Sequence, residues 1–333
     1  MDAMTRKLIH YATLAPSGHN TQPWMFSADS GTVRIYPDLS RRLPVVDPDD
    51  HALYISLGCA LENFVIAAAH HGFAAAVDHF PEDEPEECLR VRLTPSGGPH
   101  DEGLFRAIPE RQSNRRTYDG KSIPDDDIGR LLAANPHDSV TVLAFRTKQP
   151  DVEPIIEFVK EGNLAQFNDA AFVRELISWI RFSRREVREC HDGLTAAALG
   201  FPSIPRWLGT FIMSRLVKPI REARKQEQGI RSSPLLLLFI ARRNDKRHWV
   251  DIGRSFERVA LTAASLGIAH AHVNMPCEVE PIRRKLASHL DLPAAEQPLL
   301  LIRFGFAKRL PRTPRRAVEE VMKVPRQGAA VVA

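Results

Sequence analysis

The sequence predicts an α+β protein made of two similar halves, each with a sheet flanked by helices. Short alternating or apolar runs, typical of strands, are interspersed with longer runs that carry apolar residues at helical spacing. One helical run recurs at an offset of 195 residues (Gly58 to Gly253), together with the strands on either side of it. Such a recurrence indicates that a strand–helix–strand unit was duplicated within one chain.

The composition is that of an ordinary folded protein. A chain of 333 residues corresponds to about two domains, and 44% hydrophobic with 26% charged residues is typical of globular chains. The formal net charge of +4 is too small to indicate nucleic-acid binding. The four cysteines are widely spaced, so we expect them to be reduced. Because no apolar signal core is present and the longest apolar run, Leu235–Ala241, is too short to span a bilayer, we expect a cytoplasmic protein without membrane spans.

The first half is expected over residues 1–103. A helix-like run with Leu8, Ala12 and Ala15 leads into a punctuated loop, and a polar connection over Asp38–Asp50, expected at the surface, precedes the main helix. Residues 94–103 hold two prolines and three glycines, which is typical of a linker. The predicted regular elements of this half are the strand Thr32–Tyr36, the helix Ile55–Gly72 and the strand Cys88–Leu93.

The repeat is carried by the helix. Val250–Gly267 matches Ile55–Gly72 without a gap, with five identities in eighteen positions. Strands Leu235–Ala241 and Leu299–Phe304 flank the second copy as the two predicted strands flank the first. Any two alanine-rich amphipathic helices can look alike, but the shared context favours duplication. The identical pairs are Gly58 with Gly253, Glu62 with Glu257, Ala68 with Ala263, Ala69 with Ala264, and Gly72 with Gly267.

The second half, residues 104–333, is longer. A helix is expected to begin at Ile123–Ile128, where acidic residues suit a first turn. A stretch over 179–233 has no counterpart in the first half and is rich in arginine and aromatic residues. After an arginine- and proline-rich tail, a last helix is expected over Ala317–Val324.

A loop over Ala15–Trp24 is the first candidate for a site, because Pro16, Gly18 and Pro23 punctuate it and amide side chains follow one another. Asn20 and Gln22 each offer a donor and an acceptor on one planar group. That matches a ligand edge with adjacent N–H and C=O groups, such as that of a flavin. A tight, self-capped loop without a ligand is the alternative.

The segment Arg111-x-Ser113-x-Arg115 is a candidate phosphate site. Guanidinium groups donate charge-assisted, often bidentate hydrogen bonds to a phosphate, and a hydroxyl adds another. A solvated arginine-rich turn is the alternative.

These two motifs resemble those of FMN-dependent nitroreductases. Pro16-Ser17-x-x-Asn20-x-Gln22-Pro23-Trp24 is similar to the loop after the first core helix of that family, where Pro, Ser and Asn lie against the isoalloxazine ring. The resemblance assigns Arg111 and Ser113 to the FMN phosphate and ribityl chain and Arg115 to the pyrimidine edge. Because the spacing to Tyr118 is one residue longer than in the family, Arg116 is an alternative to Arg115.

Two further segments match the family more loosely. Pro311–Arg316 resembles the C-terminal basic pair that closes over the FMN phosphate, which makes Arg315 and Arg316 candidates. Asn274–Glu278 falls where the family places a loop along the ring, which adds Met275 and Pro276. No base pattern accompanies Cys277, so we do not expect a nucleophile there.

The arrangement most resembles the duplicated, Acg-type branch of the nitroreductase superfamily. This implies two nitroreductase-like α/β-sandwich halves that form a pseudo-dimer, a helical lid at about 179–233, and one FMN per chain. The implied activity is hydride transfer between a reduced donor, with NAD(P)H as the candidate, and a small acceptor, without a catalytic side chain. A lid-covered protein that sequesters FMN without turnover is the alternative, and a basic interaction module without flavin is a third. A monomer could function, and a homodimer stays open.

Metal, dinucleotide and nucleic-acid sites are not expected. No glycine-rich dinucleotide fingerprint is present, which favours FMN over FAD. The basic run 181–188 contains Glu186 and is followed by Glu189, as on a solvated helix face. The histidines fit no metal-ligand spacing; they include His19, His51, His70, His71, His79, His270 and His272.

Overall fold

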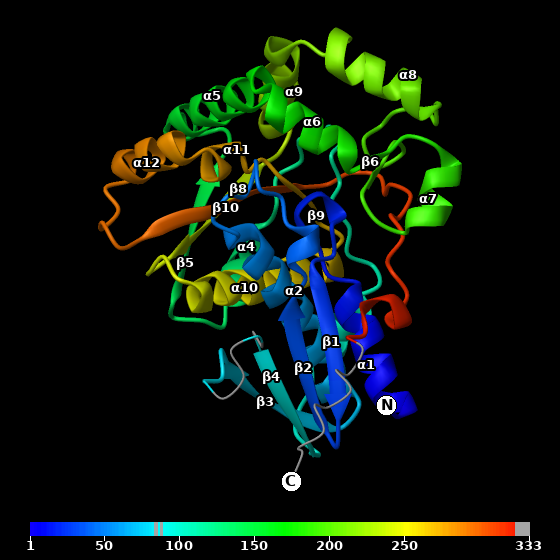
Figure 1. Ribbon diagram of the computed structural model, residues 1–333. Coiled ribbons are helices and arrows are strands. Elements are labelled where there is room, and N and C mark those ends of the chain that lie inside the picture. Colours follow the sequence, from blue (N-terminus) through cyan, green and yellow to red (C-terminus); the bar gives the residue numbers. More distant parts are fainter. Residues whose placement is uncertain (83–85, 87–88, 324–333) are drawn as a thin grey trace.

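The computed structural model describes residues 1–82, 86 and 89–323. Two four-stranded antiparallel sheets are joined through two long helices, α2 (His51–His70) and α10 (Lys246–Ser265), which cross at the centre of the molecule (Figure 1). The first sheet has the order β1-β2-β4-β3 and the second β5-β8-β10-β9. The strands are β1 (Trp24–Asp29), β2 (Thr32–Pro37), β3 (Phe73–His79), β4 (Leu89–Pro95), β5 (Val140–Arg146), β8 (Leu235–Ala241), β9 (Ala269–His272) and β10 (Gln297–Gly305).

The two sheets share one topology over the described residues. In each, two antiparallel strands are followed by the long helix and then by two more strands, and the last strand lies between the second and the third. The strands β2 and β8 and the helices α2 and α10 lie where the repeat predicts them, although both helices begin four residues earlier than predicted. β1, β3, β5 and β9 were not predicted; β9 has only four residues, too few for a periodic signal.

Two glycines of the repeat set the helix crossing. A Cβ on Gly58 would collide with the carbonyl oxygen of Val250, and one on Gly253 would collide with that of Ile55. The backbones of α2 and α10 therefore touch, and the Cys59 thiol donates to the Gly253 carbonyl at 3.2 Å. The identity of these two positions follows from one shared contact.

The central helix α2 is apolar on all sides because both halves pack around it. Leu57, Leu61 and Phe64 are fully buried and belong to one core with Phe239 and Phe256 of the second half. By length and composition α2 could cross a membrane, but 83% of its most apolar stretch is buried inside the protein, as expected for a core helix.

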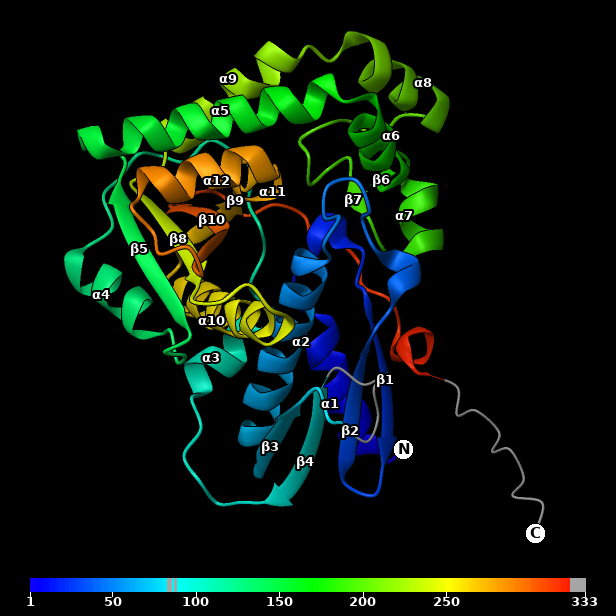
Figure 2. The same cartoon turned by 60° about the vertical axis from the view of Figure 1, so that its left-hand side comes forward.

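The remaining helices cover the sheets and build an upper layer. As Figures 1 and 2 show, the helices between β5 and β8 form the layer that lies farthest from the first sheet. Two short strands, β6 (Ile180–Arg181) and β7 (Leu194–Thr195), pair within this layer. The other α-helices are α1 (Ala3–Thr13), α3 (Glu102–Ala107), α4 (Asp125–Ala133), α5 (Glu153–Asn168), α6 (Ala170–Ser178), α7 (Arg184–Cys190), α8 (Arg206–Phe211), α9 (Pro219–Arg231), α11 (Met275–Glu278) and α12 (Glu280–His289).

Three predictions about connections need correction. The segment between β5 and β8 begins well before residue 179, because α5 and α6 also belong to it. The polar connection 38–50 is not wholly at the surface: Asp47 is buried and accepts from the backbone N–H groups of Ala52 and Leu53 at 3.0 and 2.9 Å. The predicted linker 94–103 begins inside β4, and α3 starts at Glu102.

The tail ends differently from the prediction. Instead of a helix over Ala317–Val324, only a single 3₁₀ turn forms, at Val318–Val321, and Val324 lies outside the described residues. Beyond it, Met322 bridges to Phe26, and the Lys323 N–H donates to the Phe26 carbonyl at 2.7 Å. The C-terminal segment thus joins the edge of the first sheet. Cys88 of the predicted first-half strand also lies outside the described residues.

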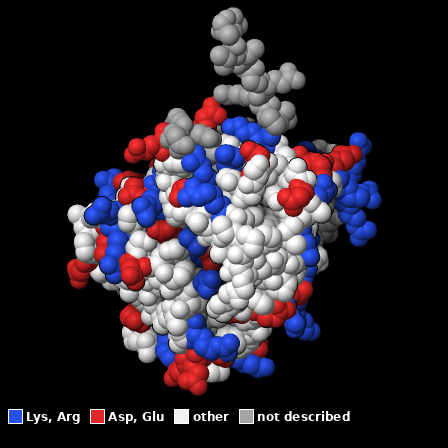
Figure 3. Space-filling view, turned by 90° about the horizontal axis from the view of Figure 1, so that it is seen from below, with Lys and Arg blue, Asp and Glu red and all other residues white. Residues whose placement is uncertain are grey.

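The charged side chains on the face shown in Figure 3 are interspersed. Lysine and arginine alternate with aspartate and glutamate around a broad uncharged area, and no large patch of one sign is visible there. This agrees with the small net charge of the chain.

Candidate functional site

A cavity of about 820 Å³ lies where the two halves meet. The loop after α1, the segment after α3, the C-terminal tail, β9 and the upper helices all contribute to its walls. This volume is in the range of small-molecule and cofactor sites. Nine of the twelve predicted site residues line it: Pro16, Ser17, Asn20, Arg111, Ser113, Arg115, Arg116, Met275 and Arg315.

The loop after α1 holds an unusual backbone. His19, Asn20 and Gln22 have φ values of 48°, 56° and 53°, a left-handed region that non-glycine residues rarely adopt. The Ser17 hydroxyl fixes the turn by accepting from the Gln22 N–H at 2.9 Å. Such conformations persist where the surrounding structure enforces them, and they cluster at functional sites.

Asn20 leaves one polar atom without a partner. Its Nδ2 donates to the Gly193 carbonyl at 3.0 Å, whereas its buried Oδ1 has no hydrogen-bond partner among the described residues. A buried acceptor of this kind costs stability unless something donates to it. Because Asn20 lines the cavity, this acceptor suits a ligand N–H.

Gln22 does not line the cavity, contrary to its predicted place at a ligand edge. Its Nε2 donates to the His191 carbonyl at 2.9 Å, and its Oε1 accepts from the Arg316 N–H at 2.8 Å. The Arg316 side chain also points away, toward the Gln22 and Glu320 carbonyls. These two residues therefore bind the loop to the upper layer and to the tail.

Arg111 is buried and forms an ion pair with Glu257. Its Nε lies 3.1 Å from Glu257 Oε1 without hydrogen-bond geometry, and its Nη2 donates to the Leu14 carbonyl at 3.1 Å. Burial raises the pKa of Glu257 to about 7, although Arg111 opposes this rise. This pair explains the second identity of the repeat only in part, because the first-half Glu62 has other partners.

Arg315 brings a second guanidinium to the same place. Its Nη2 donates to the Leu14 and Ala15 carbonyls at 3.4 and 3.2 Å, and its buried Nε has no partner among the described residues. Burial and the nearby charge of Arg111 lower its pKa to about 9. Two arginines beside one carboxyl leave an excess of positive charge, which suits an anionic ligand.

Arg115 projects into the cavity. The Arg115 side chain is exposed to the cavity, which the surrounding protein encloses. Desolvation in this enclosure and the charge of Arg303 lower the pKa of Arg115. Among the described residues no hydrogen bond or ion pair holds it, so its donors are available. Burial lowers the pKa of His19 to about 4 and that of His272 to about 3, and Arg115 adds to both shifts, so these two cavity imidazoles are neutral.

Of the remaining predicted residues, Ser113, Arg116 and Met275 line the cavity and Pro276 does not. Ser113 is placed by a bridge to His270 of β9, and Arg116 is exposed at the cavity wall. Met275 lines the cavity at the start of α11, whereas the neighbouring Pro276 is buried and does not line it.

Several cavity residues were missed by the sequence analysis. Asn163 and Gln166 are buried on α5; Asn163 Oδ1 has no partner among the described residues, and Gln166 Nε2 donates to Glu278 Oε2 at 2.6 Å. Nothing in the sequence separates these amides from surface helix residues. The upper layer adds mainly apolar side chains, among them Leu194, Ala198, Phe201, Met213 and Val217.

Comparison with known proteins follows the resemblance noted in the sequence. No family model matches the chain. A Mycobacterium tuberculosis protein named "Putative NAD(P)H nitroreductase Rv3131" is 27% identical over 336 residues, which cover 98% of this chain and 93% of that protein. A second protein of the same organism, named "Putative NAD(P)H nitroreductase acg", is 25% identical over 96% of this chain and 95% of its own length. The predicted resemblance to Acg-type nitroreductases is thus confirmed over nearly the whole chain.

Among solved structures, the FMN-dependent nitroreductase NfnB of Mycobacterium smegmatis, in complex with NADPH, covers 68% of this chain and 99% of its own, with 14% identity and a TM-score of 0.42. A nitroreductase with bound FMN from Bacteroides fragilis covers 62% of this chain and 89% of its own, with 18% identity and a TM-score of 0.36.

Proposed function

We propose that this protein is an FMN-dependent oxidoreductase of the nitroreductase type. The proposal is carried by one observation: the loop with Asn20, the segment with Arg111 and Arg115, and the tail residue Arg315 meet around one cavity. These segments lie about a hundred and two hundred residues apart in sequence. Each segment resembles an FMN-binding motif in sequence. Their distance along the chain does not by itself predict that they meet around one cavity.

The residues fit FMN in both charge and hydrogen-bonding capacity. Arg111 and Arg315 would hold the phosphate with Ser113, since their positive charge exceeds that of Glu257. Asn20 would bind a ring edge through its unpartnered Oδ1, and Arg115 would stand at the other polar edge with donors that the protein does not use.

FMN, when bound, supplies two-electron hydride chemistry, so no nucleophilic side chain is required. Arg115 places a fixed positive charge in the cavity, which favours negative charge on a ligand beside it. His19 and His272 are neutral and add no charge of their own to that of Arg115. The apolar wall from the upper layer keeps water away and so strengthens the electrostatic contribution.

We propose NAD(P)H as the reduced donor and a small molecule as the acceptor. The donor rests on the names of the two curated relatives, which share nearly the whole length of the chain.

We also propose that residues 1–103 and 104–333 are nitroreductase-like halves of a pseudo-dimer, and that 179–233 acts as a lid. The shared strand order supports the first, and the cavity contacts of Leu194, Phe201 and Met213 support the second. The lid is connected to the loop that follows α1, because the carbonyls of His191 and Gly193 accept hydrogen bonds from the side-chain amides of Gln22 and Asn20.

A second candidate function is storage or sequestration of FMN without turnover. The lid favours it, because the same contacts that exclude water would also exclude a nicotinamide or a bulky acceptor.

Reconstitution with FMN, followed by stopped-flow mixing with NADH or NADPH, tests these proposals. An oxidoreductase shows bleaching of the flavin absorbance and its return when a quinone or nitro compound is added. Bound flavin that is not reduced by either nucleotide, or that is never re-oxidised by an acceptor, favours sequestration. If the protein takes up no FMN, both functions are wrong.

A further inference from the structure

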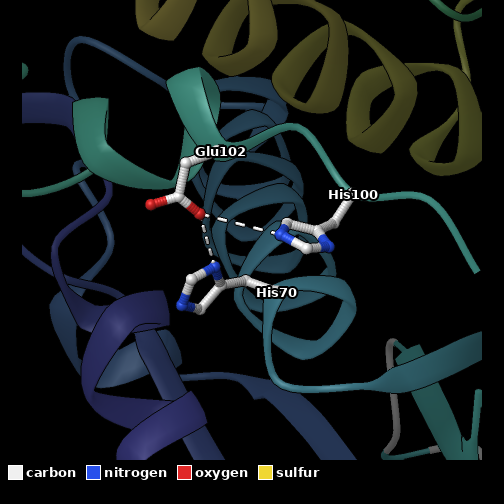
Figure 4. Close-up of side chains that lie close together, drawn as sticks. All are labelled: His70, His100 and Glu102. Atoms are coloured by element: carbon white, nitrogen blue, oxygen red, sulfur yellow. Dashed lines mark ion pairs between the residues drawn. The ribbon is translucent and has the colours of Figure 1, made fainter. Parts of the chain in front are cut away.

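Three potential metal ligands meet outside the cavity, at the C-terminal end of α2 (Figure 4). His70 lies in the last turn of α2, His100 in the connection that follows β4, and Glu102 at the start of α3. Glu102 Oε2 lies 2.9 Å from His70 Nδ1 and 3.7 Å from His100 Nε2. All three ligand atoms lie within 4.8 Å of one another.

The three side chains are held in place by their neighbours. The His70 ring stacks on Phe105, with centroids 3.6 Å apart and planes 9° apart. Arg106 Nε donates to Glu102 Oε1 at 2.6 Å, which leaves Oε2 turned toward the two imidazoles. Outer partners of this kind orient ligands in metal sites and increase affinity.

A second group of potential metal ligands, formed by Asp47, Asp49 and His51, is less available to an ion. Both carboxylates face the same atom, His51 Nδ1, at 3.0 and 2.5 Å. Asp47 additionally accepts from two backbone N–H groups, and Arg283 lies 3.4 Å from Asp49. Both carboxylates of this group are thus already committed to backbone N–H groups or to Arg283, whereas Glu102 Oε2 faces only the two imidazoles.

We propose that His70, His100 and Glu102 form a zinc site. Two imidazole nitrogens and one carboxylate oxygen are ligands that Zn²⁺ prefers, and at bond lengths of about 2.0–2.2 Å tetrahedral ligand atoms lie roughly 3.3–3.6 Å apart. The separations of 2.9 and 3.7 Å from Glu102 Oε2 to the two imidazole nitrogens bracket this range, so small rotamer changes suffice. The cluster is partly exposed, which leaves the fourth position to water.

The sequence analysis expected no metal, because these residues fit no ligand spacing. They are 30 and 2 residues apart, and a two-stranded excursion through β3 and β4 separates the first from the others. Zinc here would tie the end of α2 to the start of α3, the short helix that leads to Arg111. The ion would therefore secure the connection between the two halves and would not take part in redox chemistry.

The test is a Zn²⁺ titration of the full chain, without a histidine tag and stripped with a chelator, against a chromophoric competitor. Cys190, an exposed thiol, is first replaced by serine, since it offers an unrelated Zn²⁺ ligand. We expect one equivalent of Zn²⁺ to bind, and His100→Ala and Glu102→Gln each to weaken binding at least tenfold. His289→Ala, at an exposed histidine outside the cluster, should bind as the parent does.

X-ray absorption on the loaded protein should show nitrogen and oxygen ligands without sulfur. Zn²⁺ should raise the midpoint of thermal unfolding of the parent and of His289→Ala, but not of His100→Ala. The proposal is overturned if the parent binds no Zn²⁺, or if His100→Ala and Glu102→Gln bind as tightly as the parent. Binding should be the same with and without FMN, so the result is independent of the proposed function.

Discussion

Arg111 and Arg115 occupy one cavity but differ in what else they do. Arg115 has no protein partner among the described residues, whereas Arg111 is the cation beside buried Glu257. We predict that Arg115→Ala weakens FMN binding by about 2 kcal/mol, roughly thirtyfold, and leaves the free energy of unfolding of the apoprotein unchanged. Fluorescence titration and urea unfolding measure the two quantities.

Arg111→Ala is the informative comparison. It should weaken FMN binding and also destabilise the apoprotein by about 3 kcal/mol at pH 8, above the Glu257 pKa of about 7, because a buried carboxylate then loses its partner. If both variants bind FMN as the wild type does, the phosphate and ring site has been placed wrongly.

His51 stabilises the start of α2 through its charge. The pKa of His51 is raised to about 9: burial opposes the rise, and the carboxylates of Asp47 and Asp49 produce it. Arg283 and Glu278 are the other charged groups near it. Because the folded-state pKa lies above the unfolded value, this contribution is complete below about pH 6.5 and is lost as the pH rises through about 9.

We therefore predict that His51→Gln destabilises the protein at pH 6, by on the order of 2–3 kcal/mol, and much less at pH 9.5. Urea unfolding of both proteins at the two pH values measures the difference. His289→Gln is the control, and a His51→Gln effect that does not change with pH would contradict the charged state assigned here.

Residue types at the site were predictable, but their orientation was not. Asn20 and Gln22 are equivalent in the sequence, yet only Asn20 faces the cavity. The left-handed backbone at both residues and the contacts with Gly193 and His191 decide this, and those partners lie about 170 residues away. Of the two adjacent arginines, only Arg315 lines the cavity, because the side chains of neighbouring residues point in different directions.

The α2–α10 crossing depends on glycine at both contact points. We predict that Gly253→Ala destabilises the protein by about 3 kcal/mol or more, because the new methyl group meets the Ile55 carbonyl and two packed helices must separate. Gly129→Ala, in the exposed helix α4, is the matched control: nothing lies within 4 Å of its Cβ, so it should be neutral or slightly stabilising. Chemical unfolding of both variants provides the measurement, and equal effects would show that the crossing tolerates a side chain.

Elements marked by the repeat or by an unbroken apolar run were predicted, and several others were not. The strand Leu235–Ala241 was placed correctly because seven successive apolar residues, all buried, leave no alternative. β9 has only four residues, two of them histidines, so its place beside β10 is a property of the tertiary structure. The predicted insertion began at residue 179 and so left out α5 and α6. No sequence match between the two halves marks where the insertion starts.

The segment 179–233, which we propose as a lid, is held to the rest of the protein through Asp192. Its carboxylate accepts from Arg181 at 2.9 and 2.6 Å and pairs with Arg41 of the first half. We predict that Asp192→Ala loosens the lid and accelerates reduction of bound FMN by NAD(P)H at least several-fold. Glu189→Ala, which removes an exposed pair with Arg185 in the same segment, is the control. Unchanged stopped-flow rates in a folded Asp192→Ala protein would show that the segment does not limit access.

At the scale of the whole molecule, the described residues around Glu257 and around its repeat partner Glu62 differ in their ion pairs. Glu257 meets Arg111, but its repeat partner Glu62 is paired with Arg254 and Arg258 at 2.9 and 2.8 Å. Arg6, one of only two cations before the first loop, pairs with Glu319 at the surface. The position related by the repeat is thus already occupied by the protein's own ion pairs.

We predict one FMN per chain. Flavin absorbance against protein concentration, on a fully reconstituted sample separated by gel filtration, gives the ratio and the oligomeric state together. A ratio near two would mean that the second position also binds, in spite of the pairs around Glu62.

The docking of the C-terminal segment on β1 has a consequence for the order of assembly. Met322 and Lys323 complete the edge of the first sheet, and Arg315 reaches the carbonyls at the end of α1. These residues are synthesised after the first-half residues that they contact. A nascent chain can therefore fold much of its first sheet before residues 315–323 are made, but its cavity is complete only afterwards. A product that ends before Arg315 should therefore lack a complete cavity and bind no FMN.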